Sequence, residues 1–285
     1  MLPDEDVVLG RLLGWCEEDP RVRAVVLTSS RANGRADELS DYDVVLGVRG
    51  LAVFRADPSW VVRYGEPAAR WGEESELLGL ATSFLGVVYA DGVKVDYTVW
   101  PEELLARVSA ADALPDGLDV GYRVLLDKDG LTAAWAPPSY RAHIPARPAE
   151  DEYRAVVEEF WWASTYAAKA LWRGEVVFAK FVVDHDMKLG PLRRVLEWKI
   201  ELDGDWSVRP GVCGRGLERL LPADLRDDLA ATYVGSGVEE SWRALDATIA
   251  LFRRVATEVA DHLGYAYPVE ADRQVSAHLA AVRRL

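Results

Sequence analysis

The sequence has few cysteines, no long apolar run and no basic residues at its N-terminus. Cys16 and Cys213 are the only cysteines among 285 residues, which argues against a disulfide framework and a CxxC-type zinc site. No apolar run approaches the roughly 18 residues that a membrane span needs. The acidic start Met-Leu-Pro-Asp-Glu-Asp lacks the basic region of a secretory signal. We therefore expect a cytoplasmic protein without a membrane partner.

Basic residues are also in short supply. Lysine and arginine number 33 against 47 aspartates and glutamates, which gives a formal net charge of −14. Such a field repels the phosphates of nucleic acids and attracts cationic molecules. An acidic surface also favours solubility alone. The charge therefore points to a cationic small molecule and away from nucleic acid, without establishing either, and we expect a monomer.

The order of the predicted elements divides the chain into two parts. An amphipathic helix from Val8 to Cys16 comes first, and apolar stretches rich in β-branched residues then predict several strands. The segment 135–148 holds four prolines in 14 residues and reads as a linker. Beyond it, helical periodicity dominates. We expect an α+β fold, with a mixed β-sheet and helices in a catalytic domain at 1–140 and a helical bundle for substrate and nucleotide at 150–285. The expected strands are Val22 to Thr28, Tyr42 to Val48, Trp60 to Tyr64, Leu85 to Tyr89, Val93 to Trp100 and Tyr122 to Leu126.

Two carboxylates at the start of the second strand carry the first chemical signal. Side chains alternate along a strand, so Asp41 and Asp43 project from one face. Paired carboxylates suit Mg²⁺ together with substrate phosphates. The small residues Ser29 and Ser30, at the end of the preceding strand, would let backbone N–H groups approach a phosphate. Four other Asp-x-Asp pairs occur in the chain, so only this context distinguishes the pair at 41 and 43.

A third carboxylate lies in the middle of an apolar strand. Asp96 shares one strand face with Lys94 and Thr98, and an acid in such a strand is rare unless it is paired or binds metal. Three carboxylates on neighbouring strands would hold two Mg²⁺ ions for an in-line nucleotidyl transfer. Asp41, Asp43 and Asp96 are thus the predicted metal-binding and catalytic residues, with Asp96 also the general base.

Longer stretches extend this signal beyond a short motif. They are Ser29-Ser30-Arg31 with Ser40 to Val45, Lys94 to Thr98, Leu125 to Asp129, the dense run Glu159 to Arg173, Ala231 to Tyr233, Leu251 to Val255 and Tyr265 to Pro268. Together they resemble the aminoglycoside 6-adenylyltransferases, also called streptomycin adenylyltransferases, of the polymerase-β-like nucleotidyltransferase superfamily. The resemblance implies ATP as donor, two Mg²⁺ ions and transfer of AMP to an aminoglycoside hydroxyl. It also implies a nucleotide site at Ser29, Ser30 and Arg31.

One position departs from the superfamily pattern. Ser29 stands where the superfamily usually has glycine, and serine enters positive φ less readily than glycine does. The phosphate turn is therefore expected to differ. The segment from Val53 to Leu85 matches the family poorly, so the acceptor is less well predicted than the chemistry.

A helical stripe in the second part carries the remaining candidates. Glu159, Trp162, Tyr166 and Lys169 fall on one face of a predicted helix. We predict that Lys169 binds the triphosphate and that the other three contact the acceptor, although a solvated helix face gives the same pattern.

Two other readings stay open from sequence alone. A nucleotidyltransferase acting on a different acceptor fits the same carboxylates, and so does a nucleotide-binding regulatory module without turnover. The sequence contains no Gly-x-x-x-x-Gly-Lys-Ser/Thr loop and no kinase-type catalytic loop, which disfavours a phosphotransferase.

Overall fold

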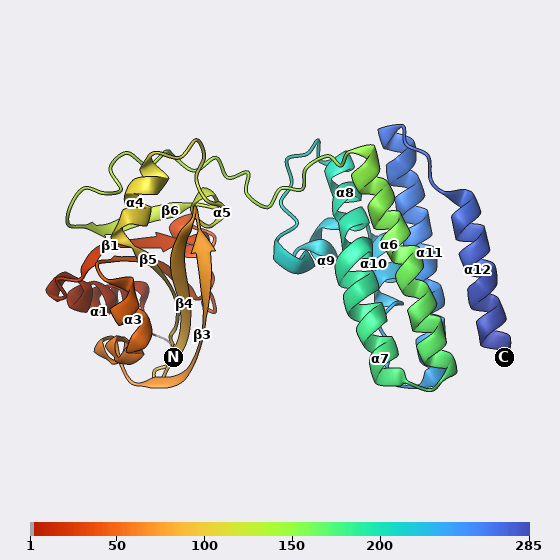
Figure 1. Cartoon of the computed structure of the whole chain (residues 1–285), viewed down its shortest axis with the longest axis horizontal. Helices are drawn as coiled ribbons and strands as arrows, with labels where there is room; N and C mark the ends of the chain where they lie inside the picture. Colours follow the sequence, from red (N-terminus) through yellow and green to blue (C-terminus); the bar gives the residue numbers. More distant parts are fainter. Residues whose placement is uncertain (1–2) are drawn as a thin grey trace. The chain divides into compact units, whose positions relative to one another are not determined.

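The computed structural model describes residues 3–285, which form two compact units (Figure 1). The first unit ends at Ala142 and the second begins at His143. The first combines one β-sheet with short helices, and the described part of the second consists of helices and loops. The expected α+β fold is thereby confirmed. The catalytic role predicted for 1–140 and the substrate-binding role predicted for 150–285 stay predictions.

Six strands form the sheet of the first unit, in the order β3-β4-β5-β2-β1-β6. Strands β2 and β5 are parallel, and all other neighbours are antiparallel. Strands β1 and β2 have the bounds that were predicted from their apolar composition, rich in β-branched residues, and both are almost fully buried. The bounds are β1 Val22–Thr28, β2 Tyr42–Val48, β3 Pro67–Leu77, β4 Leu80–Tyr89, β5 Lys94–Pro101 and β6 Tyr122–Asp127.

The two faces of the sheet differ in how they are covered. On one face, side chains such as Val44 and Tyr97 belong to a large apolar core that includes residues of helices α1 and α3 and the 3₁₀ helix η1. On the other face, Val45 and Trp100 pack with helix α4 and Trp135 in a smaller core. This smaller core covers the ends of β2 and β5, and the polar starts of both strands lie beyond it. The helices of this unit are α1 Glu5–Glu18, α2 Ser29–Ala32, α3 Leu51–Ala56, η1 Pro58–Arg63, α4 Glu102–Ser109 and α5 Asp116–Asp119.

The expected strand from Trp60 to Tyr64 is wrong. This segment lies largely in the 3₁₀ helix η1, where Pro58 occupies the first turn and the Asp57 side chain accepts a hydrogen bond from the Ser59 N–H. Proline is pre-organised for that position. The Trp60 indole donates to the Phe54 carbonyl at 3.1 Å. A local turn signal therefore prevails over the β-branched composition.

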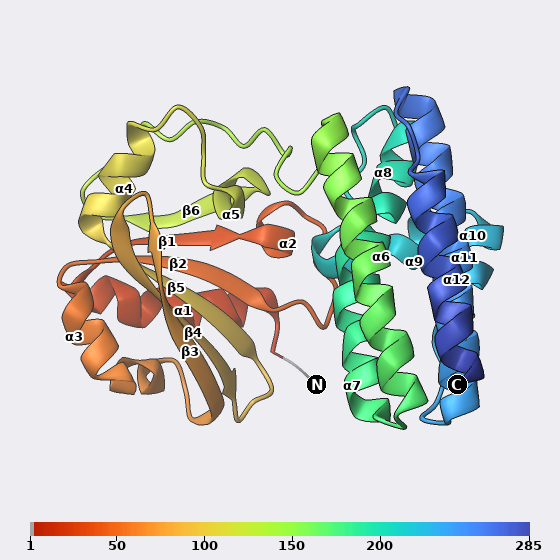
Figure 2. The same ribbon diagram turned by 45° about the vertical axis from the view of Figure 1, so that its right-hand side comes forward.

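Strand β3 was not expected from the sequence. Its residues are mostly exposed and carry Glu73, Glu74 and Glu76, so they show no apolar alternation. The strand forms because it pairs with β4 along nearly its whole length, from Pro67 to Leu77. Figure 2 shows β3 and β4 as a long hairpin at the edge of the sheet.

The second unit is built around two long helices. Phe160 of α6 stacks on Phe252 of α11 with ring centroids 3.6 Å apart, and α12 packs against α6 (Figure 2). Within residues 3–285, no helix is long and apolar enough to cross a membrane. The helices are α6 Glu150–Trp172, α7 Val176–Phe181, η2 Val182–Leu192, α8 Arg193–Asp203, η3 Val212–Gly214, α9 Leu217–Leu220, α10 Ala223–Ala230, α11 Val238–Leu263 and α12 Val269–Arg284.

Candidate active site

The three predicted carboxylates lie on the partly open face of the sheet. Asp43 of β2 stands opposite Asp96 of the parallel strand β5, so their side chains share a face and a level. Asp41 immediately precedes β2, on the same alternation as Asp43. The register of β2 against β5 thus brings together acids that are more than 50 residues apart in the sequence.

Lys94 connects two of these acids. Its Nζ donates to Asp41 Oδ2 at 2.5 Å and to Asp96 Oδ2 at 3.0 Å. Burial disfavours the charge of this ammonium, but its hydrogen bonds to both carboxylates outweigh that effect and raise the pKa of Lys94. One cation therefore contacts two of the three acids.

Asp43, the acid that Lys94 does not contact, has a raised pKa. Burial, followed by the neighbouring charges of Asp96 and Asp41, raises the pKa of Asp43 to about 6. A hydrogen bond with Ser29 works in the opposite direction and favours the ionised form. A carboxyl pKa raised by burial and by neighbouring carboxylates is typical of catalytic and metal-binding sites.

Asp96 offers an oxygen without a partner. Its Oδ1 is buried and accepts no hydrogen bond from the described residues, while Oδ2 is held by Lys94. A buried oxygen without a donor is unfavourable unless a ligand or cation completes it. Gly86 of β4 adjoins it, since a Cβ at that glycine would lie 2.9 Å from Asp96 Oδ1.

The donor set fits a hard divalent cation. Three carboxylates, one with an unpartnered oxygen, are the ligands that Mg²⁺ prefers. Within residues 3–285, however, no three acidic, histidine or cysteine side chains surround a common point, so the expected convergence on one point is not seen. The Lys94 ammonium contacts two of the three acids instead. Its side chain is 41% exposed, so it has room to move if a divalent cation takes over its partners.

The backbone of the turn after β1 does not show the difference that Ser29 led us to expect. Ser29 adopts φ +59°, the left-handed region that glycine enters most easily. Its backbone N–H donates to the Gly121 carbonyl at 3.2 Å, and α2 follows directly. The turn therefore keeps the conformation that a glycine would have there, at some cost in backbone strain.

Arg31 has a different environment from the one that a nucleotide ligand needs. Its guanidinium donates to the Ser40 and Asp41 carbonyls and to the Glu5 carboxylate, and it lies 3.9 Å from the centroid of the Tyr42 ring. These contacts hold the loop that leads to Asp41. The geometry favours a positioning role for Arg31 over the predicted contact with nucleotide.

The four candidates of α6 do form one surface. Trp162 is 62% exposed, and its ring lies 4.7 Å from that of Tyr166. Lys169 Nζ lies 4.6 Å from the centroid of Tyr166. Glu159 is exposed one turn before Trp162, whereas Trp161 is buried in the core of the unit. The predicted stripe is thus solvent-facing, and its ligand roles stay predictions.

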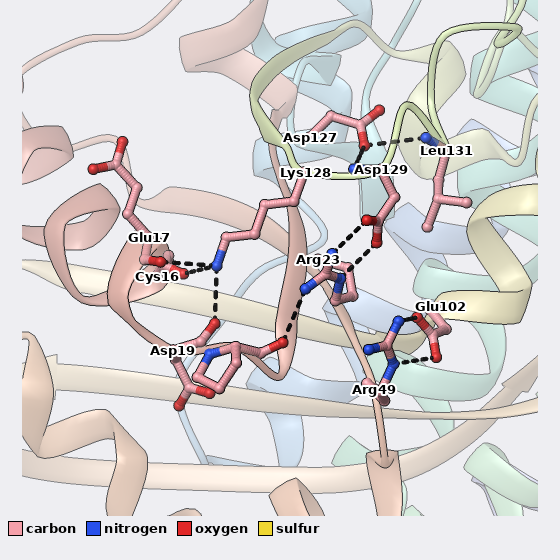
Figure 3. A network of polar contacts seen from close by, with 11 residues as sticks. Cys16, Glu17, Asp19, Arg23, Arg49, Glu102, Asp127, Lys128, Asp129 and Leu131 are labelled. Carbon is pink, nitrogen blue, oxygen red and sulfur yellow. Dashed lines mark hydrogen bonds and ion pairs between the residues drawn. The ribbon is translucent and has the colours of Figure 1, made fainter.

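A second Asp-x-Asp pair of the same unit has no free oxygen to offer. Figure 3 shows Asp127 and Asp129 within a network of hydrogen bonds. Asp127 accepts from backbone N–H groups that include Leu131 and Thr132, and Asp129 pairs with Arg23. Between them, Lys128 donates to three backbone carbonyls around the end of α1, at 2.8–2.9 Å. This pair is structural.

Sequence reasoning missed two features of the site. It placed Lys94 and Asp96 on one face, but the contact of Lys94 with Asp41 depends on the register of β2 and β5. It also passed over Gly86, although a glycine inside an apolar strand signals a close approach of other atoms.

Comparison with known proteins shows the family of this chain. The family model described as streptomycin adenylyltransferase matches residues 3–282. The chain is similar to the aminoglycoside 6-adenylyltransferase of Bacillus subtilis, at 30% identity over 93% of each chain, and to that of Campylobacter jejuni, at 29% identity over 96% of this chain and 94% of the relative. The crystal structure of an aminoglycoside 6-adenyltransferase from Bacillus subtilis aligns with a TM-score of 0.48, at 25% identity and 99% coverage of both chains. Since the family model spans nearly the whole sequence, this chain belongs to the streptomycin adenylyltransferase family of nucleotidyltransferases.

Proposed function

We propose that the protein transfers AMP from Mg·ATP to a hydroxyl of an aminoglycoside, with streptomycin the first candidate, and releases pyrophosphate. Membership of the family and the names of its relatives support the reaction class and the acceptor class. The observation that carries the proposal is the row of carboxylates on the sheet, with an unpartnered oxygen at Asp96.

The transfer is a single displacement at phosphorus. The acceptor hydroxyl oxygen forms a bond to the α-phosphorus of ATP, while the bond from that phosphorus to the oxygen bridging to the β-phosphate breaks. The electron pair of the broken bond leaves with pyrophosphate. The hydroxyl proton passes to Asp96, whose Oδ1 has no competing donor among the described residues. Lys94 fixes Oδ2 of the same carboxylate and so orients the base.

Asp41, Asp43 and Asp96 would hold the metal in this proposal. When bound, two Mg²⁺ ions supply charge neutralisation for the triphosphate and activation of the hydroxyl. In their absence, burial of Asp43 and then the charges of Asp96 and Asp41 raise the pKa of Asp43 to about 6. Ser29 and Ser30 are the proposed phosphate contacts of the turn after β1.

The exposed stripe of α6 supplies the proposed ligands of the second unit. Lys169 has no carboxylate partner among the described contacts and lies only against Tyr166, so its charge is available for a phosphate. Glu159, Trp162 and Tyr166 are proposed to contact the acceptor, since a carboxylate and two rings suit a cationic sugar derivative.

Streptomycin suits this site better than kanamycin-type acceptors. It carries guanidinium groups, which pair with carboxylates in a planar, bidentate way that simple amines cannot reproduce. The net charge of −14 attracts such a cation. Rising salt should accordingly raise the KM for the acceptor, because the field is screened beyond about 8 Å at physiological ionic strength.

A product assay tests the proposal. The protein is incubated with ATP, Mg²⁺ and a panel of aminoglycosides, and products are identified by mass spectrometry while pyrophosphate is measured in parallel. We expect an AMP ester of streptomycin and little product with kanamycin. Transfer to kanamycin alone would overturn the acceptor, and no transfer to any aminoglycoside would overturn the function. The monomeric state, the cytoplasmic location and the lack of a nucleic-acid partner stay predictions.

A further inference from the structure

A cavity of about 290 Å³ lies beside the carboxylates, on the β3–β4–β5 part of the sheet. Its lining includes Trp71 of β3, Phe84 and Gly86 of β4, and Asp96 of β5. All of these residues belong to the first unit. The cavity therefore depends on no element of the second unit.

The strand register explains why there is a cavity at this place. Trp71 stands opposite Gly86, Gly86 opposite Asp96, and Asp96 opposite Asp43. These residues form one row across the sheet, and the row has no side chain at Gly86. Two strand spacings of about 4.8 Å separate the backbones of Trp71 and Asp96. An indole thus forms one wall and the proposed base forms the other. Between them Gly86 has no side chain, and the Phe84 ring lies over this glycine, 3.3 Å from where a Cβ would be.

The aromatic wall is unusual for an edge strand. Trp71 is 63% exposed, and its ring centroid lies 6.0 Å from that of Phe84. Exposing an indole to water is unfavourable, and neither ring belongs to the cores of the unit. The two ring planes are inclined at 55° and form an angled platform, on which a ligand can lie flat against one ring while it touches the other. The faces of such rings also attract cations.

The sheet order indicates which substrate lies here. The Ser29 turn follows β1, on one side of the β2–β5 pair, whereas β4 and β3 lie on the other side. In an in-line displacement the entering hydroxyl and the leaving pyrophosphate are on opposite sides of the α-phosphorus. With the phosphates at the Ser29 turn, the hydroxyl must approach from the side of β4 and β3.

We infer that this cavity is the acceptor subsite and that the aminocyclitol ring of the acceptor packs against Trp71, with Phe84 beside it, and with its reacting hydroxyl directed at Asp96. The inference rests on the proposed function, because it assigns a place to the acceptor of that reaction. Lys94 and Arg70 also line the cavity, and Lys94 is already balanced by Asp41 and Asp96. Recognition on this wall therefore comes from ring stacking and cation–π contact rather than from ion pairs.

Steady-state kinetics and direct binding of streptomycin test the inference. The variants are Trp71→Ala, Trp71→Phe and, as a matched control, Trp172→Ala, which removes another exposed tryptophan from α6. Trp71→Ala should raise the KM for streptomycin about tenfold and the KM for ATP less than twofold. It should weaken streptomycin binding, measured by calorimetry without ATP, to a similar degree. Trp71→Phe should retain most of the affinity, and Trp172→Ala should behave as the wild type.

Each other outcome has a definite meaning. A higher KM for ATP with an unchanged KM for streptomycin would make the platform an adenine site and overturn the inference. Unchanged constants for both substrates would also overturn it, provided that thermal denaturation shows Trp71→Ala to be folded. If the wild type transfers AMP to no aminoglycoside, the proposed function fails and the inference falls with it. If the wild type transfers AMP normally and Trp71→Ala is unaffected, the inference about the cavity is wrong and the proposed function stands.

Discussion

Two Asp-x-Asp pairs of the first unit have opposite surroundings. At Asp127 and Asp129, backbone N–H groups such as that of Leu131 and the guanidinium of Arg23 donate to the carboxylate oxygens (Figure 3). The Thr132 N–H and hydroxyl donate to Asp127 as well. At Asp41, Asp43 and Asp96, the Lys94 ammonium is the only basic side chain among the described residues that pairs with any of the three carboxylates. The first pair therefore has a lowered pKa at both acids, whereas the pKa of Asp43 is raised to about 6.

The same Asp-x-Asp motif can therefore stabilise a turn or bind an external ligand, depending on its surroundings. A carboxylate whose oxygens are met by donors of the same chain stabilises a turn and has nothing left for a ligand. A carboxylate left short of donors, beside others of like charge, is held ready for an external cation. In this protein, the number of donors that reach each carboxylate, rather than the motif, separates the structural acids from those proposed to be functional.

The largest effect is expected at Asp96. Asp96→Asn removes the proposed base and one metal ligand, so kcat should fall by about 10³-fold or more, equivalent to roughly 4 kcal/mol of transition-state stabilisation. Thermal stability without divalent cations should stay the same or rise, because repulsion among the acids decreases. Single-turnover and steady-state assays with saturating Mg·ATP measure the first effect. Near-normal turnover in this variant would show that Asp96 is neither the base nor a required metal ligand.

The next largest effect is on the free energy of unfolding, and Asp→Asn substitutions in the two pairs should change it in opposite directions. The folded-state pKa of Asp43, about 6, lies above the unfolded value of 3.8, so metal-free stability falls as pH rises from about 4 to 6 and stays reduced above that. Asp43→Asn should thus stabilise the metal-free protein at pH 8 by at most about 3 kcal/mol, and the gain should vanish near pH 4. Mg²⁺ should reduce the gain, since binding to the folded wild type stabilises it.

Asp127→Asn is the matched control with the opposite sign. Burial opposes the charge of Asp127, but its hydrogen bonds with Thr132 and Leu131 outweigh that effect, and its pKa is lowered. Its contribution to stability is present above about pH 4 and is lost as pH falls. This variant should therefore be destabilised at pH 8 and approach the wild type in acid. Chemical denaturation across this pH range, with EDTA, measures both variants, and equal signs at pH 8 would refute the comparison.

A moderate effect on stability alone is expected at Lys128. Its ammonium donates to the carbonyls of Cys16, Glu17 and Asp19, where the orphan carbonyls of α1 need donors. Lys128→Met should cost about 2 kcal/mol of unfolding free energy, as hydrogen bonds to a charged group do. The kcat at a temperature well below the midpoint should be unchanged. A large loss of kcat in a folded variant would mean that this network belongs to the site.

The smallest effect is expected at a lysine with no such partners. Lys169 lies only against Tyr166 in the described contacts, so Lys169→Ala should leave unfolding nearly unchanged. It should raise the KM for ATP about tenfold, the equivalent of about 1.4 kcal/mol, and the KM for the acceptor less. Initial rates with each substrate varied in turn give both constants. Equal increases would point to a structural role for this lysine.

Several elements are determined by the sequence alone. The apolar runs of β1 and β2 and the helical periods of α6 and α11 are local patterns, and they predicted these elements correctly. The alternation of side chains in a strand also placed Asp41 with Asp43, and Lys94 with Asp96, since this period follows from backbone geometry. The family was likewise readable from the sequence, because the matching stretches span nearly the whole chain.

Other features were decided only by the tertiary structure. Strand β3 carries no apolar alternation and exists through its pairing with β4. The contact of Lys94 with Asp41 and the row from Trp71 through Gly86 to Asp96 depend on registers between strands distant in sequence. The Arg31 guanidinium contacts the Ser40 carbonyl and the Tyr42 ring of its own loop. No sequence pattern predicts these contacts. Local periodicity fixes which face a side chain takes, but only long-range pairing fixes what stands beside it.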